Sequence, residues 1–447
     1  MKDSKSTLQI SKDLLKLAVP NSITYFIQNL IDPITLYFIG NLGHNDYTGF
    51  VGLGNSWYII SSYSILLGIS STVDTFVSQM YGQKKLRDCG TYFYRAAILT
   101  FILCIPFSLL LIYGSIFLRF VGIDKQTADS ASHFATYLIP YLFLSTQYEL
   151  LLRFLNAQQI AAPVTLITII TTIAHPIWCS LFINDLNFGY LGAALAKAFT
   201  CAISLQLLWF YIIKTNCCQF TLGPIVLSEV FKDLKGFASV ALPGALMSCL
   251  DCWAFELVSL IAGTIGSEEL SVSVSLSQIN LLFFMIPVGL GRSACTFIGN
   301  NFGAKNYHAY RLYTMVGFLL NLILVSFSSL IFVIFRRQIG TYFFKDEGMV
   351  TLFSQAALIL AAMILYDSTQ GYFARVALGM KMQSEATLAV IGAYYVVMLP
   401  AAYYFIWVLK KGLFGLWGAN FLAAASLALF YGFFIWRKLK PIYTKLD

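Results

Sequence analysis

The chain has 447 residues and a mean hydropathy of +0.73; 58% of its residues are hydrophobic and only 11% are charged. So few charges cannot cover the surface of a soluble protein of this length, which excludes a water-soluble fold. The formal net charge of +8 is compatible with anionic lipid as a partner, and we do not expect nucleic acid binding.

Apolar stretches of about 20 residues or more recur along the chain, each long enough to cross the roughly 30 Å hydrocarbon layer as a helix. Helices are expected because a backbone in lipid must satisfy its own hydrogen bonds, and the alternation of β-barrel strands is absent. We predict an all-α integral membrane protein with 12 transmembrane helices, at Leu14 to Ile39, Val51 to Val77, Ala96 to Leu118, Phe134 to Leu155, Val164 to Ile183, Leu191 to Ile213, Phe237 to Ile265, Val272 to Phe297, Leu312 to Phe335, Leu352 to Ala377, Thr387 to Leu409 and Leu416 to Trp436.

Lysine and arginine are distributed unequally between the two sides of these spans. The N-terminus, the even-numbered loops and the C-terminus hold 20 of the 29, the odd-numbered loops hold 7, and Lys197 and Arg292 lie inside spans. The positive-inside rule therefore predicts that both termini are cytosolic.

The two halves of the chain repeat the same short sequence motifs at nearly constant offsets. Ala18-Val19-Pro20 returns as Ala241-Leu242-Pro243, Tyr81-Gly82-Gln83-Lys84 as Phe302-Gly303-Ala304-Lys305, and Phe188-Gly189 as Phe414-Gly415, at offsets of 223, 221 and 226 residues. We predict two pseudo-symmetric six-helix bundles: an N-terminal lobe at 1–213, a cytoplasmic linker at 214–236 and a C-terminal lobe at 237–447. Parallel repeats of this kind are typical of secondary transporters, whose lobes rock about a midplane site.

Acidic residues inside spans are the main candidates for function, because an ionised side chain in the bilayer is costly and often serves an ion or proton pathway. Burial disfavours the anion, which suits reversible protonation. The spans contain Asp32, Asp74, Glu149, Asp251, Glu256 and Asp367.

Helical spacing separates these acids. Asp251 and Glu256 lie roughly 140° apart on a regular helix, so both cannot face one cavity squarely. Asp251 shares its stripe with Phe255, whereas Asp367 shares its stripe with Gln370 and Gly371, which places an acid, an amide and a gap together. Asp251 and Asp367 are the favoured functional acids, while hydrogen-bonded packing is the favoured role of Asp32, Asp74 and Glu149.

Enzymatic motifs are missing. The sequence has neither H-E-x-x-H nor the G-x-x-x-x-G-K-[ST] phosphate loop, so we expect neither an enzyme nor a cofactor. His175 precedes Pro176 and is interpreted as a hydrogen-bonded histidine in a kinked helix, in preference to a proton relay.

A series of short motifs follows in order along the chain, from about Leu17 to Phe433. The motifs are Pro20 through Gln28 to Gly43, Asp74-Thr75 through Gly82, Arg153 through Gln158, Leu242-Pro243 through Glu256-Leu257, Pro287-Val288-Gly289 with Gly299-Asn300, Asp367-Ser368 with Gln370-Gly371, and Tyr394-Tyr395 with Pro400. In these motifs the chain resembles the multidrug and toxic compound extrusion (MATE) family, in particular its eukaryotic branch.

The resemblance implies that Asp251 and Asp367 line the cavity of the C-terminal lobe as proton and cation sites, assisted by Glu256. We expect Gln278 and Gln370 to belong to the same proton and substrate site, and we take Gln28, Asp32 and Asp74 as candidates in the N-terminal lobe. The family usually has Glu where Asp251 stands, and eukaryotic members often have an acid where Gln278 stands. The family's Arg-Gly-x-Gly is here Leu378-Gly379-Met380-Lys381.

We therefore expect an antiporter that exports organic cations or amphipathic toxic compounds in exchange for protons, in preference to sodium. The expected membrane is the plasma membrane or a vacuolar or endosomal membrane. Two alternatives are a flippase for lipid-linked precursors, which needs a wide basic cavity, and a membrane-embedded enzyme or receptor, which needs a clustered nucleophile, a metal set or a soluble head.

Overall fold

The computed structural model of the chain describes residues 6–43 and 45–443. Within that part of the chain all regular elements are helices, which confirms the predicted all-α class. Lys2, Lys5 and Lys445, which contribute to the predicted charge asymmetry, lie outside the described residues.

Contacts divide the chain into two compact units. The N-terminal unit comprises Ile23–Cys249, and the C-terminal unit comprises Leu250–Asp447 together with Met1–Ser22. Each boundary falls inside a helix, namely α1 (Thr7–Gln28) and α12 (Leu234–Ile265). The start of α1 joins the C-terminal unit, where the Tyr313 hydroxyl donates a hydrogen bond to Asp13 over 2.7 Å. The lobe limits expected from the repeat, 1–213 and 237–447, stay a prediction.

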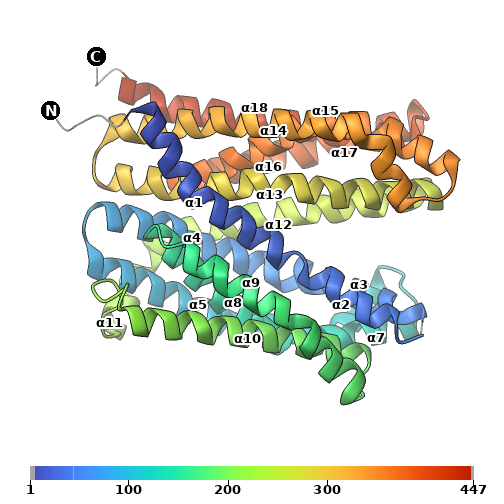
Figure 1. Cartoon of the computed structure of the whole chain (residues 1–447), viewed down its shortest axis with the longest axis horizontal. Coiled ribbons are helices and arrows are strands. Elements are labelled where there is room, and N and C mark those ends of the chain that lie inside the picture. Colours follow the sequence, from blue (N-terminus) through green and yellow to red (C-terminus); the bar gives the residue numbers. More distant parts are fainter. Residues whose placement is uncertain (1–5, 44, 444–447) are drawn as a thin grey trace. The chain divides into compact units, whose positions relative to one another are not determined.

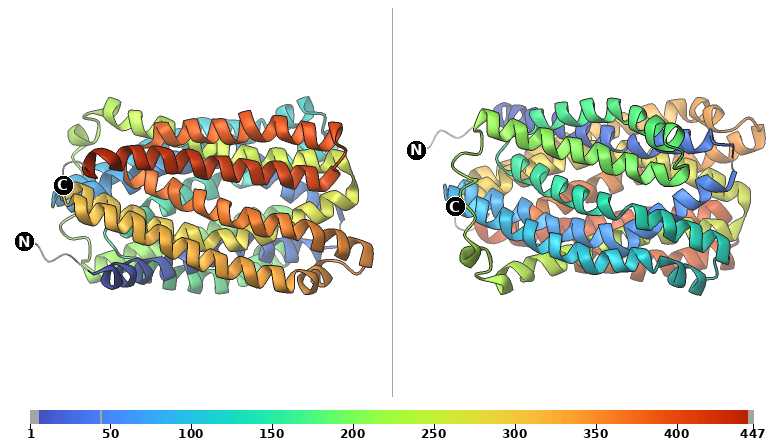
Figure 2. Two further views of the ribbon diagram at one scale, coloured as in Figure 1. Left: turned by 90° about the horizontal axis from the view of Figure 1, so that it is seen from above. Right: turned by 90° about the horizontal axis from the view of Figure 1, so that it is seen from below.

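The described part of the N-terminal unit has two large hydrophobic clusters, built around buried side chains such as Phe154 and Phe134, and a small one that contains Leu118. Figure 2 shows α8, α9 and α10 running side by side. Its helices are α2 (Ile31–Gly40), α3 (Asn45–Tyr58), η1 (Ile59–Tyr63), α4 (Ser64–Gly82), α5 (Leu86–Ile112), α6 (Gly114–Phe120), α7 (Lys125–Tyr137), α8 (Ile139–Ala157), α9 (Ala162–Cys179), η2 (Ser180–Asp185), α10 (Tyr190–Thr215) and α11 (Leu227–Val230).

The C-terminal unit packs its long helices lengthwise, as Figure 1 shows for α13, α14, α15 and α18. Its core gathers Phe332, Phe353 and Trp417. Its helices are α13 (Ser267–Gly303), α14 (Tyr307–Phe343), α15 (Glu347–Gly379), α16 (Gln383–Val390), η3 (Ile391–Met398), α17 (Leu399–Tyr403), η4 (Tyr404–Val408) and α18 (Gly412–Tyr443).

Ten helical segments of the described chain are long and apolar enough to cross a membrane, and they match ten of the predicted spans. The other two predicted spans are each built from two successive helices. The span predicted at Leu14 to Ile39 is interrupted between α1 and α2, and the one predicted at Phe134 to Leu155 between α7 and α8. Each of these four helices, taken alone, is either too short or too polar to count among the ten membrane-crossing segments.

One of the repeated motifs, at residues 81–84 and 302–305, forms the same helix end in both units. Helices α4 and α13 end at Gly82 and Gly303, and Lys84 and Lys305 follow with φ of 61° and 57°. In both copies the next backbone N–H returns to the carbonyl five residues earlier, at 3.0 Å for Lys85 and 2.9 Å for Asn306. This bond closes a Schellman-type helix end. The duplicated sequence therefore encodes the same helix stop in both units.

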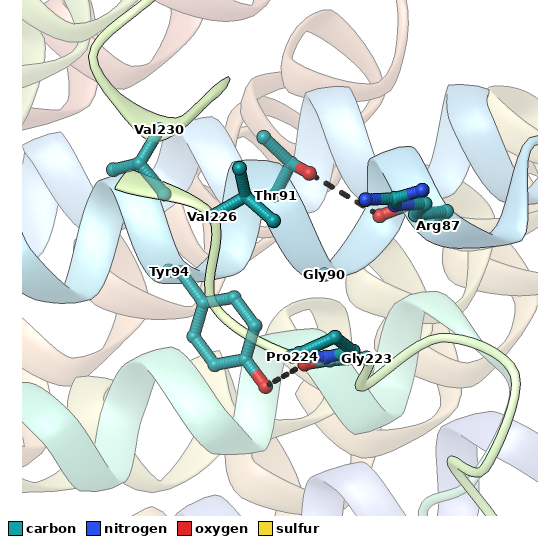
Figure 3. Close-up of a pocket in the computed structure, with 8 residues that line it drawn as sticks. All are labelled: Arg87, Gly90, Thr91, Tyr94, Gly223, Pro224, Val226 and Val230. Carbon is teal, nitrogen blue, oxygen red and sulfur yellow. Dashed lines mark hydrogen bonds between the residues drawn. The ribbon is translucent and has the colours of Figure 1, made fainter. Parts of the chain in front are cut away.

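The segment between α10 and α12 is bound to α5 within the N-terminal unit. Arg95 donates to the carbonyl oxygens of Val230 over 2.6 Å and Glu229 over 2.9 Å. The Tyr94 hydroxyl donates to the Gly223 carbonyl over 3.0 Å, beside a small pocket (Figure 3). A methyl group on Gly90 would collide with the Thr221 carbonyl oxygen. The linker thus lies directly on the α5 backbone.

Gly90→Ala should loosen this segment. Overpacking costs about 1–3 kcal/mol, which raises the population of a locally open linker about tenfold. Limited trypsin digestion at the exposed Lys232 measures the opening, and cleavage should accelerate accordingly. Gly223→Ala is the matched control, because its added methyl group meets nothing within 4 Å. Equal cleavage rates in both variants would contradict the clamp.

Candidate functional site

Asp367 of α15 is a buried carboxylate held by neutral amides. Its side chain is 2% exposed. Asn280 of α13 donates to Oδ2 over 3.0 Å, and Gln370, one turn along α15, donates to Oδ1 over 3.0 Å. Among the residues that the structure describes, Asp367 forms no ion pair. A buried carboxylate with amide partners alone has no fixed counter-charge, so a proton or a bound cation can supply it.

Asp251 of α12 lies close enough to Asp367 for the two carboxylates to repel each other. Tyr394, on the π-helical segment η3, is its hydroxyl partner. The second oxygen, Oδ1, is enclosed and accepts no hydrogen bond from any described residue. Two interacting carboxylates, one with an unsatisfied oxygen, form an acidic site that can accept one more hydrogen bond.

One arginine lies within electrostatic range of this acidic site. Arg375, two turns beyond Asp367 on α15, interacts electrostatically with Asp251 and with the buried Arg292 of α13. The Arg375 stem packs over Gly291. The site is therefore a mixed cluster in which amides contact Asp367 and an arginine lies within electrostatic range of Asp251.

The close approach predicted at Gly371 is present. A methyl group on Gly371 would collide with the Phe284 ring, whose Cε2 atom would lie 2.6 Å away. Phe255 also lies over Tyr394, with the ring centroids 6.2 Å apart. Phe255, on the Asp251 stripe, thus packs against Tyr394, the hydroxyl partner of Asp251.

The other predicted residues of this site differ in their contacts and exposure. Gln370 contacts Asp367, as its spacing along the helix predicts. Gln278 has an exposed side chain, and its neighbour Asn280 is the α13 residue that contacts Asp367. Glu256 is half-buried. The roles assigned to Gln278 and Glu256 stay predictions.

Asp74 lies in a buried ion cluster of the N-terminal unit. Arg153 of α8 pairs with Asp74 of α4 and, over 2.9 Å, with Glu149 one turn earlier on its own helix. The side chains of the three residues are 1%, 6% and 7% exposed, respectively. One cation shared by two acids in a closed environment is suited to a packing role. That role, favoured for Asp74 and Glu149 from the sequence, stays a prediction.

Asp32 has a cation of its own. The Lys197 ammonium of α10 lies 2.5 Å from the Asp32 carboxylate of α2 and donates to the Asn55 amide oxygen over 3.1 Å. Gln28, near the end of α1, is a hydrogen-bond partner of the Tyr148 hydroxyl. The N-terminal candidates are thus each engaged, and they lie in different local environments.

His175 is hydrogen-bonded within the same unit. Its Nε2 lies 2.9 Å from the Thr35 hydroxyl and its Nδ1 lies 2.7 Å from the Thr200 hydroxyl. The histidine is fully buried on α9. This environment matches the interpretation as a satisfied histidine.

Sequence reasoning missed Asn280, Tyr394 and Arg375 as members of the acidic site, and Lys197 as the partner of Asp32. All four reach their partners across helix interfaces, which spacing along one helix does not reveal. The one available signal was the presence of Lys197 inside a span, since a buried lysine demands an acidic partner.

Comparisons with known proteins agree with this architecture. The MatE family model matches residues 20–181 and again 243–404, once in each repeat. Protein DETOXIFICATION 17 of Arabidopsis thaliana is 30% identical over 393 residues, which cover 87% of this chain and 82% of the relative. Multidrug and toxin extrusion protein 1 of Pongo abelii is 27% identical over 429 residues, covering 95% of this chain and 75% of the relative.

Among solved structures, the crystal structure of the eukaryotic MATE transporter AtDTX14 superposes with a TM-score of 0.88 at 24% identity. The match covers 97% of this chain and 98% of that one. It supports the fold of two six-helix bundles. On the family match in both repeats and on these relatives, the chain belongs to the MATE family, in its eukaryotic branch, and is a multi-pass membrane transporter.

Proposed function

We propose that this transporter exports organic cations or amphipathic toxic compounds in exchange for protons, through Asp367 and Asp251. The observation that carries the proposal is Asp367 itself, a carboxylate that is 2% exposed and whose hydrogen-bond partners among the described residues are the amides of Asn280 and Gln370. Such a group is ready to exchange one positive partner for another, which is the requirement for antiport.

Competition at the carboxylates supplies the coupling. A bound organic cation compensates the negative charge of Asp367 and Asp251, while the Phe255 and Tyr394 rings offer it apolar and cation–π contacts. When the site opens outward, protons neutralise the acids and the attraction for the cation is lost. Opening inward then releases the protons to the cytosol and restores the anionic site.

Movement of the two lobes would expose the site alternately to each side of the membrane. The driving force is the proton gradient, in preference to sodium, and the membrane potential adds about 2.3 kcal/mol per charge per 100 mV. We place both termini in the cytosol on the charge asymmetry of the loops. Export then runs out of the cytosol, across a plasma membrane or into a vacuole or endosome.

The substrate class is supported by the names of the relatives, which refer to detoxification and to multidrug and toxin extrusion. It is also supported by the aromatic surroundings of the acids, because a delocalised organic cation is attracted to both. Glu256, half-buried on α12, would assist as an additional acid.

Uptake of a fluorescent organic cation into proteoliposomes tests the proposal. With the lumen acidic, uptake should exceed that of protein-free liposomes and should disappear when a protonophore collapses the gradient. Replacing external sodium by potassium should leave the rate unchanged. An uptake rate that depends on sodium and does not change when the protonophore is added would overturn proton coupling.

A further inference from the structure

The Lys197–Asp32 pair in the N-terminal unit is unequally buried. Lys197 is 5% exposed, whereas the Asp32 side chain is 57% exposed. The ammonium is further held by the Asn55 amide oxygen at 3.1 Å and lies 5.5 Å from the centre of the Tyr141 ring. The Lys197 ammonium is therefore held by residues of three helices, and Asp32 is the more exposed member of the ion pair.

The charged and titratable neighbours of this pair come from several surrounding helices. His175 and Cys179 lie on α9, Tyr58 on α3 and Tyr141 on α8, and each lies within electrostatic range of Asp32 or Lys197. Asp185, at the end of η2, is exposed. Apart from Asp32, no acid in this described neighbourhood contacts Lys197.

The two members of the pair have different needs. A buried ammonium requires an anionic partner, because a buried charge without a partner strongly destabilises the folded protein. A half-exposed carboxylate loses less than a buried ammonium when it leaves such a pair, because its surroundings enclose it less. Asp32 can therefore be exchanged for another carboxylate, while Lys197 cannot be left without one.

We propose that Lys197 anchors a second ligand site, in the N-terminal unit, which takes an aromatic monocarboxylate in the place that Asp32 now occupies. The carboxylate of the ligand would accept from the Lys197 ammonium, and its ring would lie against the partly exposed Tyr141. The site goes beyond the proposed cation export and shares no residue with the Asp251 and Asp367 cluster.

Binding of salicylate, a fluorescent aromatic monocarboxylate, to the purified protein in detergent tests this site. Asp32→Asn removes the competing carboxylate and should tighten salicylate binding by about tenfold. Lys197→Gln should abolish binding, also in combination with Asp32→Asn, whereas Lys197→Arg should retain it and shows that the fold tolerates change here. The neutral salicylamide should not bind to any variant.

Two controls separate this site from other causes. Asp129→Asn removes the exposed acid that pairs with Arg119 in the same unit and should bind salicylate like the wild type. Asp367→Asn should also bind it like the wild type, so failure of cation export leaves this result intact. The inference is overturned if Asp32→Asn gains no affinity, or if binding survives in the Asp32→Asn, Lys197→Gln double variant.

Discussion

Asp367→Asn is expected to reduce gradient-driven cation uptake to the level of protein-free liposomes. Asparagine keeps the size of the side chain but offers only one acceptor oxygen to the amides of Asn280 and Gln370, so one of these amides must turn its own oxygen toward the new NH2 group. The new side chain carries no charge at any pH. The exchange of a proton for a cation therefore has no site. Uptake of a fluorescent organic cation into proteoliposomes with an acidic lumen measures the loss, and equal reconstitution is checked by protein content.

Asp346→Asn is the matched control for this variant. Asp346 precedes the same helix, α15, and its Oδ2 accepts from the Met349 backbone N–H over 2.9 Å. Asparagine is an equally good N-cap, so uptake should remain at the wild-type level. Undiminished uptake in Asp367→Asn would remove Asp367 from the transport mechanism.

Arg153→Met should cause the largest loss of stability. Removing this cation, which is 1% exposed, leaves the Asp74 and Glu149 carboxylates in a buried place without the charge that balances them. Breaking a buried ion cluster from one side costs about 3–5 kcal/mol. The free energy of unfolding in detergent, or the midpoint of thermal unfolding, measures the change.

Neutralising the two acids distinguishes charge from packing. Adding Asp74→Asn and Glu149→Gln to Arg153→Met should restore most of the lost stability, because no uncompensated carboxylate remains. Arg337→Met breaks an exposed pair with Glu347, each side chain being 67% exposed, and should cost less than about 1 kcal/mol. A similarly small loss in Arg153→Met would show that the buried cluster does not hold the N-terminal unit together.

The fold could be predicted because lipid allows few solutions. Long apolar stretches had to become helices, and the repeated stop after Gly82 and Gly303 reappears as the same helix end in both units. The helix breaks at residues 29–30 and 138 escaped prediction, because hydropathy averaged over a span does not register a local interruption. The π-helical segment that carries Tyr394 escaped for the same reason.

Part of the acidic site followed from the spacing along one helix. Asp367 and Gln370 are three residues apart, which places them on one face of α15 and allows their hydrogen bond. Asn280 reaches Asp367 from α13, and that contact depends on how the two helices pack. The choice between Gln278 and Asn280 is a matter of helix rotation, which one sequence does not specify.

Antiport requires that cation and proton move in opposite directions through one protein. Sealed proteoliposomes with equal pH on both sides and a pH-sensitive dye in the lumen test it most directly, upon addition of an organic cation outside. We expect cation entry to drive protons out, so that the lumen becomes alkaline in the wild type and keeps its pH in Asp367→Asn. Cation entry with no change of lumenal pH, or with acidification, would contradict antiport.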